Sequence, residues 1–195
     1  GMAVVELRRT EGAWAPVVDS AFNRRVTAAT PMRISGPAAG HARLRTSADP
    51  SGTRVLGTHD NCNGGVTPWG TVLSGEEGSA DFFGGEVGGH PDAAHLARNH
   101  YADLEPHGRY GWARADRRFD INHEPNEPNR FEWVVEIDPF DPDAAPVKRT
   151  ALGRFAHEGA QCALAPDGRV VVYLGDDWEY EYCYRFVPEI GRAHV

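Results

Sequence analysis

The sequence predicts an all-β protein with long loops and one short helix. The rhythm of strands and turns is typical of a partial β-propeller of several blades, and a β-sandwich with long loops would show a similar pattern. Short apolar stretches alternate with turn signals, most clearly in the final third, around Pro166-Asp167-Gly168. No β-α-β alternation occurs, which disfavours a doubly wound parallel sheet. The 22 glycines and 14 prolines follow no collagen-like period, so we assign them to turns and loops.

The first sixty residues predict short strands separated by a long loop. Met2–Arg8 and Trp14–Val18 are expected to form a hairpin because the turn Glu11-Gly12 separates two apolar stretches. Residues 19–52 are rich in Arg, Pro and Gly and show little periodicity, so they predict loop. Arg54–Leu56 predicts a short strand.

The middle of the chain is expected to be irregular. Asn61–Gly65 predicts a tight loop, because its two glycines permit positive φ. Trp69–Ser74 predicts a strand, and Pro91 is expected to start a helix that runs to about Asp103. Residues 105–130 are rich in turn signals.

The last third predicts most of the sheet. Phe131–Ile137 is the clearest strand, and Thr150–Phe155 is a weaker one. Gln161–Ala165 and Arg169–Leu174 predict a hairpin, and the alternating aromatics of Tyr180–Val187 predict a final strand.

Charge and the length of the apolar runs each argue against one class of partner. The formal net charge is −8, and residues 1–60 carry +3, so the remainder carries −11. A negative chain is a poor ligand for nucleic acid. No apolar run approaches 18 residues, which excludes a membrane span. The surplus of carboxylates fits either metal ions or a well-solvated surface.

The three cysteines contain no C-x-x-C, which excludes a zinc ribbon or a thioredoxin-type motif. Cys162 and Cys183 lie in apolar alternation and are expected to be buried. Cys62 differs, because it lies in Asn61–Gly65. The nine histidines form no metal signature, and most are expected at the surface.

Carboxylates follow three of the expected strands. Glu76-Glu77, Glu158 and Asp176-Asp177 all lie next to glycine turns where a strand ends. If these strands belong to blades of one propeller, their ends can converge on its axis. Oxygen clusters bind calcium, and the Cys62 thiolate would add a ligand suited to iron or zinc. Solvated surface charge remains the alternative for each cluster.

Several segments resemble the PhoX-type alkaline phosphatases. The resemblance extends in order over residues 2–187 and is carried by Thr30–His41, Asn61–Thr71, Trp133–Pro142, Lys148–Phe155, His157–Ala160, Val172–Asp177 and Tyr182–Val187. It implies a β-propeller whose active site lies at one end of the central channel. It also implies hydrolysis of phosphate monoesters with a pair of ferric ions and calcium ions.

The resemblance implies roles for the acidic positions. Cys62 looks like a thiolate ligand to iron, and either Glu76 or Glu77, with Glu77 favoured, looks like a carboxylate ligand. Glu158 looks like a second ligand, to iron or calcium. For calcium, the resemblance implies one of two adjacent carboxylates, Asp176 or Asp177.

The chain departs from the family pattern at two points. Gly75 stands where family members often have Cys. The family also continues beyond this sequence, so residues 1–187 are expected to be an incomplete propeller domain with about half of the metal ligands, and inactive alone. Residues 188–195 are expected to be a non-native tail, because Ile190–Val195 matches the translation of a sequencing adapter.

Family members are usually exported to the periplasm or the exterior, so the same location is expected for the parent protein. The alternative function is a non-catalytic propeller that serves as a binding or scaffold module. Bound iron that depends on Cys62 would separate the two hypotheses.

Overall fold

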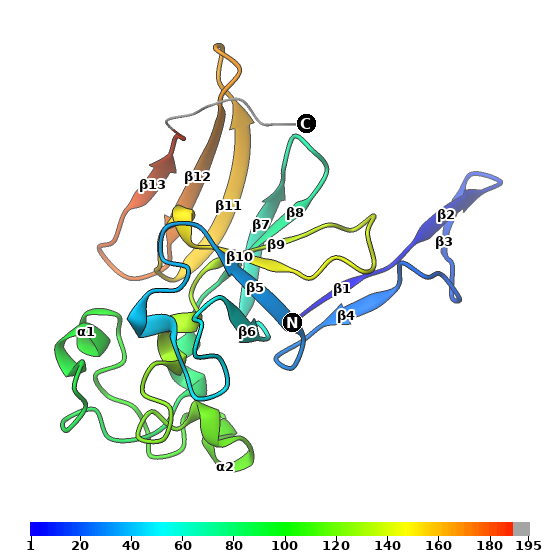
Figure 1. Ribbon diagram of the computed structural model, residues 1–195. Coiled ribbons are helices and arrows are strands. Elements are labelled where there is room, and N and C mark those ends of the chain that lie inside the picture. The colour runs from blue at the N-terminus through cyan, green and yellow to red at the C-terminus, as the bar shows by residue number, and fades with distance from the viewer. Residues whose placement is uncertain (189–195) are drawn as a thin grey trace.

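The computed structural model describes residues 1–188, which form thirteen strands in four sheets and a few short helices (Figure 1). The all-β prediction is therefore confirmed. The largest sheet has six strands in the order β6-β5-β10-β9-β8-β7. Its strands, in chain order, are β5 (Pro31–Ser35), β6 (Arg54–Leu56), β7 (Asn61–Val66), β8 (Val72–Glu76), β9 (Val134–Ile137) and β10 (Val147–Arg149).

The N-terminal residues form an arm that projects from the six-stranded sheet (Figure 1). Its tip is a hairpin of β2 (Leu7–Thr10) and β3 (Ala13–Pro16), as the Glu11-Gly12 turn predicts. Its base pairs β1 (Met2–Val4) with β4 (Arg24–Val26). The expected loop 19–52 therefore contains β4 and β5, because pairing with distant strands stabilises segments that have little periodicity of their own.

A three-stranded sheet lies beside β7 and β8 (Figure 1) and contains β11 (His157–Leu164), β12 (Val170–Asp176) and β13 (Cys183–Phe186). Glycines bring the two sheets together. A Cβ on Gly65 would lie 2.5 Å from the carbonyl oxygen of Ala160 on β11. The close approach of β7 to β11 requires the absence of that Cβ.

The short helices lie between β8 and β9 in the sequence and below the six-stranded sheet in Figure 1. They are α1 (Ala93–Arg98) and α2 (Trp112–Ala115), with 3-10 turns at Ser79–Phe82, Arg117–Phe119 and Glu127–Arg130. The predicted helix is thus confirmed in place but is shorter than expected. None of the helices within residues 1–188 has the length and apolar character that crossing a bilayer requires.

Two hydrophobic clusters form the core. The larger one centres on Phe131, which is fully buried and stacks on the buried ring of His59 at a centroid distance of 4.2 Å. The smaller one joins Leu73 and Val134 to the inner face of β12. Every residue of β9 is buried, which explains why this strand is the clearest in the sequence.

Two local predictions are wrong. Asn61–Gly65 is part of strand β7, because Gly64 and Gly65 serve close strand packing rather than positive φ. Thr150–Leu152 is a 3-10 turn, and the strand in this region is β10, just before it. The Thr150 hydroxyl donates to the carbonyl oxygen of Ser35 (2.8 Å), and Gly153 ends the turn at φ +89°.

The expected burial is also wrong for some residues. Cys162 is half-buried, and Cys183 is exposed because it lies on strand β13, at one edge of the three-stranded sheet. His59, His90 and His157 are buried, so these three are exceptions to the surface position that was expected for most histidines. The predicted tail, residues 188–195, lies outside the described residues except for Pro188.

His157 should make folding sensitive to acid. Burial lowers its pKa to about 4, although the hydrogen bond that Nε2 donates to the Gly153 carbonyl oxygen (3.1 Å) raises it. The unfolded state takes up a proton near pH 6.5, and the folded state does not. Folding stability should therefore fall by about 3 kcal/mol as pH decreases from 6.5 to 4.

Urea unfolding at several pH values measures this effect. His157→Gln should flatten the decline between pH 6.5 and 4, whereas His107→Gln, at an exposed position, should leave it unchanged. Equal slopes for wild type and His157→Gln would show that this group does not control the acid response.

Candidate metal centre

Ligand atoms of three residues, two on strands and one directly after a strand, come together where the two sheets meet. Cys62 lies on β7, Glu77 follows β8, and Glu158 lies on β11. One ligand atom from each residue, the Sγ or a carboxylate oxygen, lies within 4.8 Å of the other two. Of the sequence-predicted residues, these three are the ones that the structure brings together as a candidate metal centre.

Strand pairing is irregular at two of these residues, Glu158 on β11 and Cys62 on β7. On β11, His157 pairs with Asp176 and Gly159 pairs with Gly175, so Glu158 is an extra residue without a partner. On β7, the register also shifts between Asn61 and Gly64, and Cys62 lies within the shift. A bulge of this kind redirects a side chain away from regular alternation, and such bulges are common near active sites.

The three groups crowd negative charge. Burial, followed by repulsion from Glu158 and Asp177, raises the pKa of Glu77 to about 7, although a hydrogen bond with Cys62 acts in the opposite direction. Burial also raises the pKa of the Cys62 thiol, and the Glu77 and Glu158 carboxylates raise it further. Without a cation, the site therefore favours protonated forms of Cys62 and Glu77.

The donor set fits a bound metal ion. Glu77 Oε2 is buried and has no hydrogen-bond partner among residues 1–188. Within the same residues, no Lys, Arg or His forms an ion pair with Glu77 or Glu158. A thiolate with carboxylates suits iron, whereas calcium takes oxygen ligands and would use only the carboxylates.

Asp177 lies near this centre but outside the three-residue group. It is exposed, and it is close enough to raise the pKa of Glu77 by repulsion. Its amide donates to the carbonyl oxygen of Ala156 (3.0 Å), which ties the end of β12 to the start of β11. Its carboxylate is therefore available as a further oxygen donor at the edge of the centre.

Glu76 faces away from the group that contains Glu77. Its side chain is fully buried, and its Oε1 accepts a hydrogen bond from Lys148 Nζ at 2.7 Å. Its Oε2 accepts from the Trp133 amide at 3.1 Å. Both carboxylate oxygens thus have partners inside the protein.

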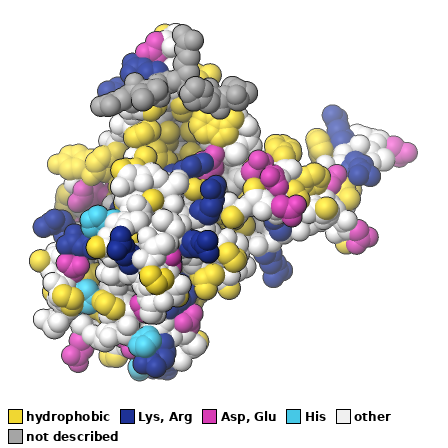
Figure 2. Space-filling view, in the orientation of Figure 1, with side chains coloured by type: hydrophobic (Ala, Val, Ile, Leu, Met, Phe, Trp, Pro, Cys, Tyr) yellow, Lys and Arg dark blue, Asp and Glu magenta, His cyan; other side chains and the backbone are white. Residues whose placement is uncertain are grey.

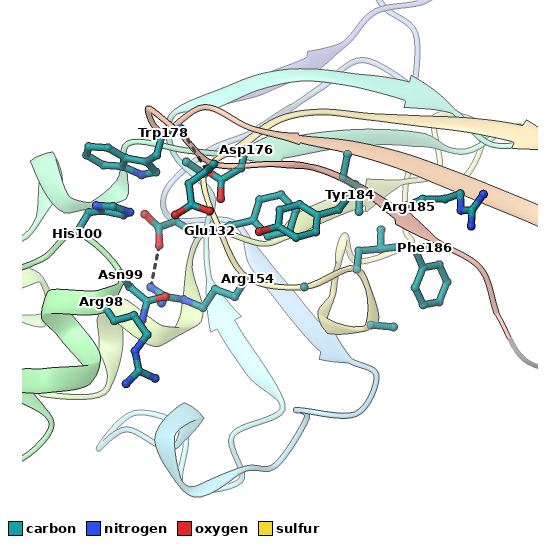
Figure 3. Close-up of a pocket in the computed structure, with 17 residues that line it drawn as sticks. Arg98, Asn99, His100, Glu132, Arg154, Asp176, Trp178, Tyr184, Arg185 and Phe186 are labelled. Carbon is teal, nitrogen blue, oxygen red and sulfur yellow. Dashed lines mark hydrogen bonds and ion pairs between the residues drawn. The ribbon is translucent and has the colours of Figure 1, made fainter.

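Asp176 lies on the wall of a cavity of about 510 Å³ (Figure 3). Glu132 and Arg154 line the same cavity and form an ion pair of 3.0 Å. At its rim, Trp178 stacks on His100 with ring centroids 3.8 Å apart. Asp176 Oδ1 accepts from the Trp178 amide (3.3 Å). The carboxylate therefore belongs to this cavity rather than to the three-residue group.

Sequence reasoning missed three charged residues that have little exposure. The side chains of Lys148, Glu132 and Arg154 are 0%, 4% and 10% exposed. In the sequence, each reads as an ordinary strand or loop residue. A usable signal exists for Lys148, because it is the single lysine in a chain with 19 arginines. Glu132 gives no comparable signal, since its φ of +67° is known only from the structure.

Comparison with known proteins gives one family and one solved structure. Residues 1–194 match the family described as alkaline phosphatase PhoX. The structure of Pseudomonas fluorescens PhoX in complex with vanadate, a transition state analogue, is 47% identical with a TM-score of 0.89. The match covers 100% of this chain and 33% of that chain. No curated protein shows significant similarity.

Proposed function

The chain belongs to the PhoX alkaline phosphatase family, and we propose that the protein carrying it hydrolyses phosphate monoesters at a metal centre that includes Cys62, Glu77 and Glu158. The observation that carries the proposal is the convergence of these three ligand atoms within 4.8 Å. The similarity to a phosphatase that binds vanadate, a transition state analogue, supports the reaction class. Because the chain spans a third of that relative, the activity is proposed for the intact protein.

The proposed metals are iron and calcium. Iron is assigned to the group with the Cys62 thiolate, and calcium to the oxygen donors at its edge, of which Asp177 is the nearer candidate and Asp176 the more remote one. When bound, the metals neutralise charge on the phosphate and position the attacking oxygen. Glu76 is assigned to the surrounding structure, because Lys148 and the Trp133 amide occupy both of its oxygens.

Without a bound cation, Cys62 and Glu77 favour their protonated forms. Cys62 and Glu77 must release their protons to bind, and both have raised pKa values. Metal uptake therefore releases protons and becomes tighter as pH increases. The bulges at Glu158 and Cys62 point these side chains toward Glu77, which limits the rearrangement that binding requires.

The wider architecture is proposed from the family. Residues 1–187 are proposed as part of a β-propeller, in which the contact of β11 with β7 and β8 is the contact between blades. The substrate is proposed to be a phosphate monoester, and the location of the parent protein to be the periplasm or the exterior. Further ligands are expected outside this chain.

A kinetic assay of the intact protein tests the function. With iron and calcium supplied, it should hydrolyse p-nitrophenyl phosphate, and vanadate should inhibit the reaction. Glu158→Gln should reduce kcat by more than about 100-fold, because it removes a metal ligand. Glu179→Gln, an exposed substitution in the loop after β12, should leave kcat unchanged.

Absence of phosphatase activity in this assay would favour the alternative, a non-catalytic binding or scaffold module. Metal-replete intact protein without phosphatase activity would contradict the proposal. So would a Glu158→Gln variant as active as wild type.

A further inference from the structure

The buried pair Lys148–Glu76 is one residue away in sequence from the candidate metal centre, because Glu76 directly precedes Glu77. Both side chains have 0% exposure, and Nζ lies 2.7 Å from Oε1. Nζ also donates to the carbonyl oxygen of Arg130 (2.9 Å) and lies 3.9 Å from the centroid of the Phe131 ring. Two of the three ammonium protons therefore have oxygen acceptors, and the charge also faces an aromatic ring.

The chain's one lysine occupies this buried position, which favours an ammonium group over a guanidinium there. The chain has 19 arginines and one lysine, and the lysine occupies a fully buried position. An ammonium is a compact point charge, whereas a guanidinium is larger and planar. The space between the carboxylate of Glu76, the carbonyl of Arg130 and the ring of Phe131 suits the smaller group.

The pair connects to the metal centre through the backbone. Glu76 Oε2 accepts from the Trp133 amide, and the Glu76 amide donates to the Trp133 carbonyl, both at 3.1 Å. The next amide, that of Glu77, donates to the carbonyl of Asp60 at 3.1 Å, two residues before Cys62. The dipeptide Glu76-Glu77 therefore joins the segment at Trp133 to the strand that carries the thiol.

Glu76 is the last residue of β8 and Glu77 directly follows it, so a fixed Glu76 side chain and its backbone hydrogen bonds constrain the direction of the next side chain. We propose that Lys148 and Glu76 form a buried positioning pair that sets where the Glu77 carboxylate stands at the metal centre. Glu76 thus acts on the metal through its neighbour instead of as a ligand. This inference rests on the proposed function.

Stability alone is a poor explanation for the pair. Burial lowers the pKa of Lys148 to about 8, although the Glu76 carboxylate raises it. Taking two charges out of water is costly, and apolar replacements of a buried pair are often equally stable. Removal of one partner leaves an uncompensated charge, so a double replacement separates positioning from folding.

The deciding variant is Glu76→Met/Lys148→Met in the intact protein. It should retain a melting temperature well above the assay temperature. Its iron dissociation constant should rise by about 10- to 100-fold, the range found when an outer partner of a metal ligand is lost. The visible absorption band from Cys62 thiolate to ferric iron should shift or weaken.

A matched control uses an ion pair on neighbouring strands. Arg149 Nε lies 2.6 Å from Glu136 Oε2, and Glu136 is tied to Trp69 and Thr71 rather than to the metal centre. Arg149→Met/Glu136→Gln should keep the iron affinity and the absorption band of wild type. Equal losses in both double variants would show a general structural effect and overturn the inference.

Glu76→Gln provides an answer if the double variant does not fold. The substitution replaces one of the two carboxylate oxygens with an NH₂ donor, so either Lys148 Nζ or the Trp133 amide would face a donor where its acceptor stood. Its iron dissociation constant should increase severalfold. An unchanged constant and band, in Glu76→Gln or in the folded double variant, would overturn the inference.

The failures of the two proposals are distinguishable. If wild type binds no iron, the proposed metal centre is wrong, and the inference about the positioning pair is wrong as well. If wild type shows the band, Cys62→Ala loses it and Glu76→Met/Lys148→Met keeps it, the centre stands and the inference alone is wrong.

Discussion

Cys62→Ala is expected to remove iron from the intact protein and to reduce kcat for phosphate monoesters by more than about 100-fold. The thiolate is the donor that distinguishes an iron site from an all-oxygen calcium site. In the variant, Glu77 and Glu158 remain close together without the soft ligand. Elemental analysis of purified protein and a p-nitrophenyl phosphate assay measure the two effects.

Cys183→Ala is the matched control for the loss of a thiol. Cys183 is exposed on β13, outside the three-residue group, and its replacement should leave both the iron content and kcat as in wild type. Full iron occupancy in Cys62→Ala would show that the thiol is not a ligand and would remove the main reason for assigning iron.

Gly75→Ala is expected to lower the free energy of unfolding by about 3 kcal/mol. A Cβ on Gly75 would lie 2.2 Å from the carbonyl oxygen of His157 and 2.6 Å from its Cβ. The backbone cannot move apart at this contact without disturbing strand pairing, because Gly75 is paired with Val134 and His157 with Asp176. Relief of the overlap would push β8 away from β11, and with it Glu77 from Glu158.

Gly159→Ala is the control, since this glycine lies in the same bulge region two residues after His157. Its Cβ would meet only the Cβ of Asn63, at an ordinary 3.9 Å. Urea unfolding should show a small change for Gly159→Ala and a large one for Gly75→Ala. Similarly small changes in the free energy of unfolding for both variants would mean that β8 and β11 do not approach as closely as in this structure.

The clash also gives a reason for glycine at position 75. Any residue with a Cβ there would require β8 and β11 to be farther apart than in this chain. Gly75 therefore suits the close approach that brings Glu77 to Glu158.

Part of the fold and the site follows from local sequence. Turn signals and apolar alternation predict the all-β class, and they place β9, β11 and β12 because these strands bury alternating or continuous apolar residues. Carboxylates next to glycine at strand ends identify Glu77 and Glu158 as candidates. Cys62 stands out because polar and glycine residues surround it.

Other features depend on partners that are remote in sequence. Alternation shows that Glu76 and Glu77 face opposite ways, but it does not show which of them faces the metal centre. That choice depends on Lys148, 72 residues away. Likewise, Asn61–Gly65 reads as a loop because the contacts that make it a strand are with Leu73 on β8 and Ala160 on β11.

Diffraction from crystals of the intact, iron-replete protein, measured at the iron absorption edge, tests the central claim most directly. We expect an anomalous peak within bonding distance of Cys62 Sγ and of carboxylate oxygens of Glu77 and Glu158. An iron peak elsewhere, or no peak in crystals shown to contain iron in the protein, would contradict the assignment of this site.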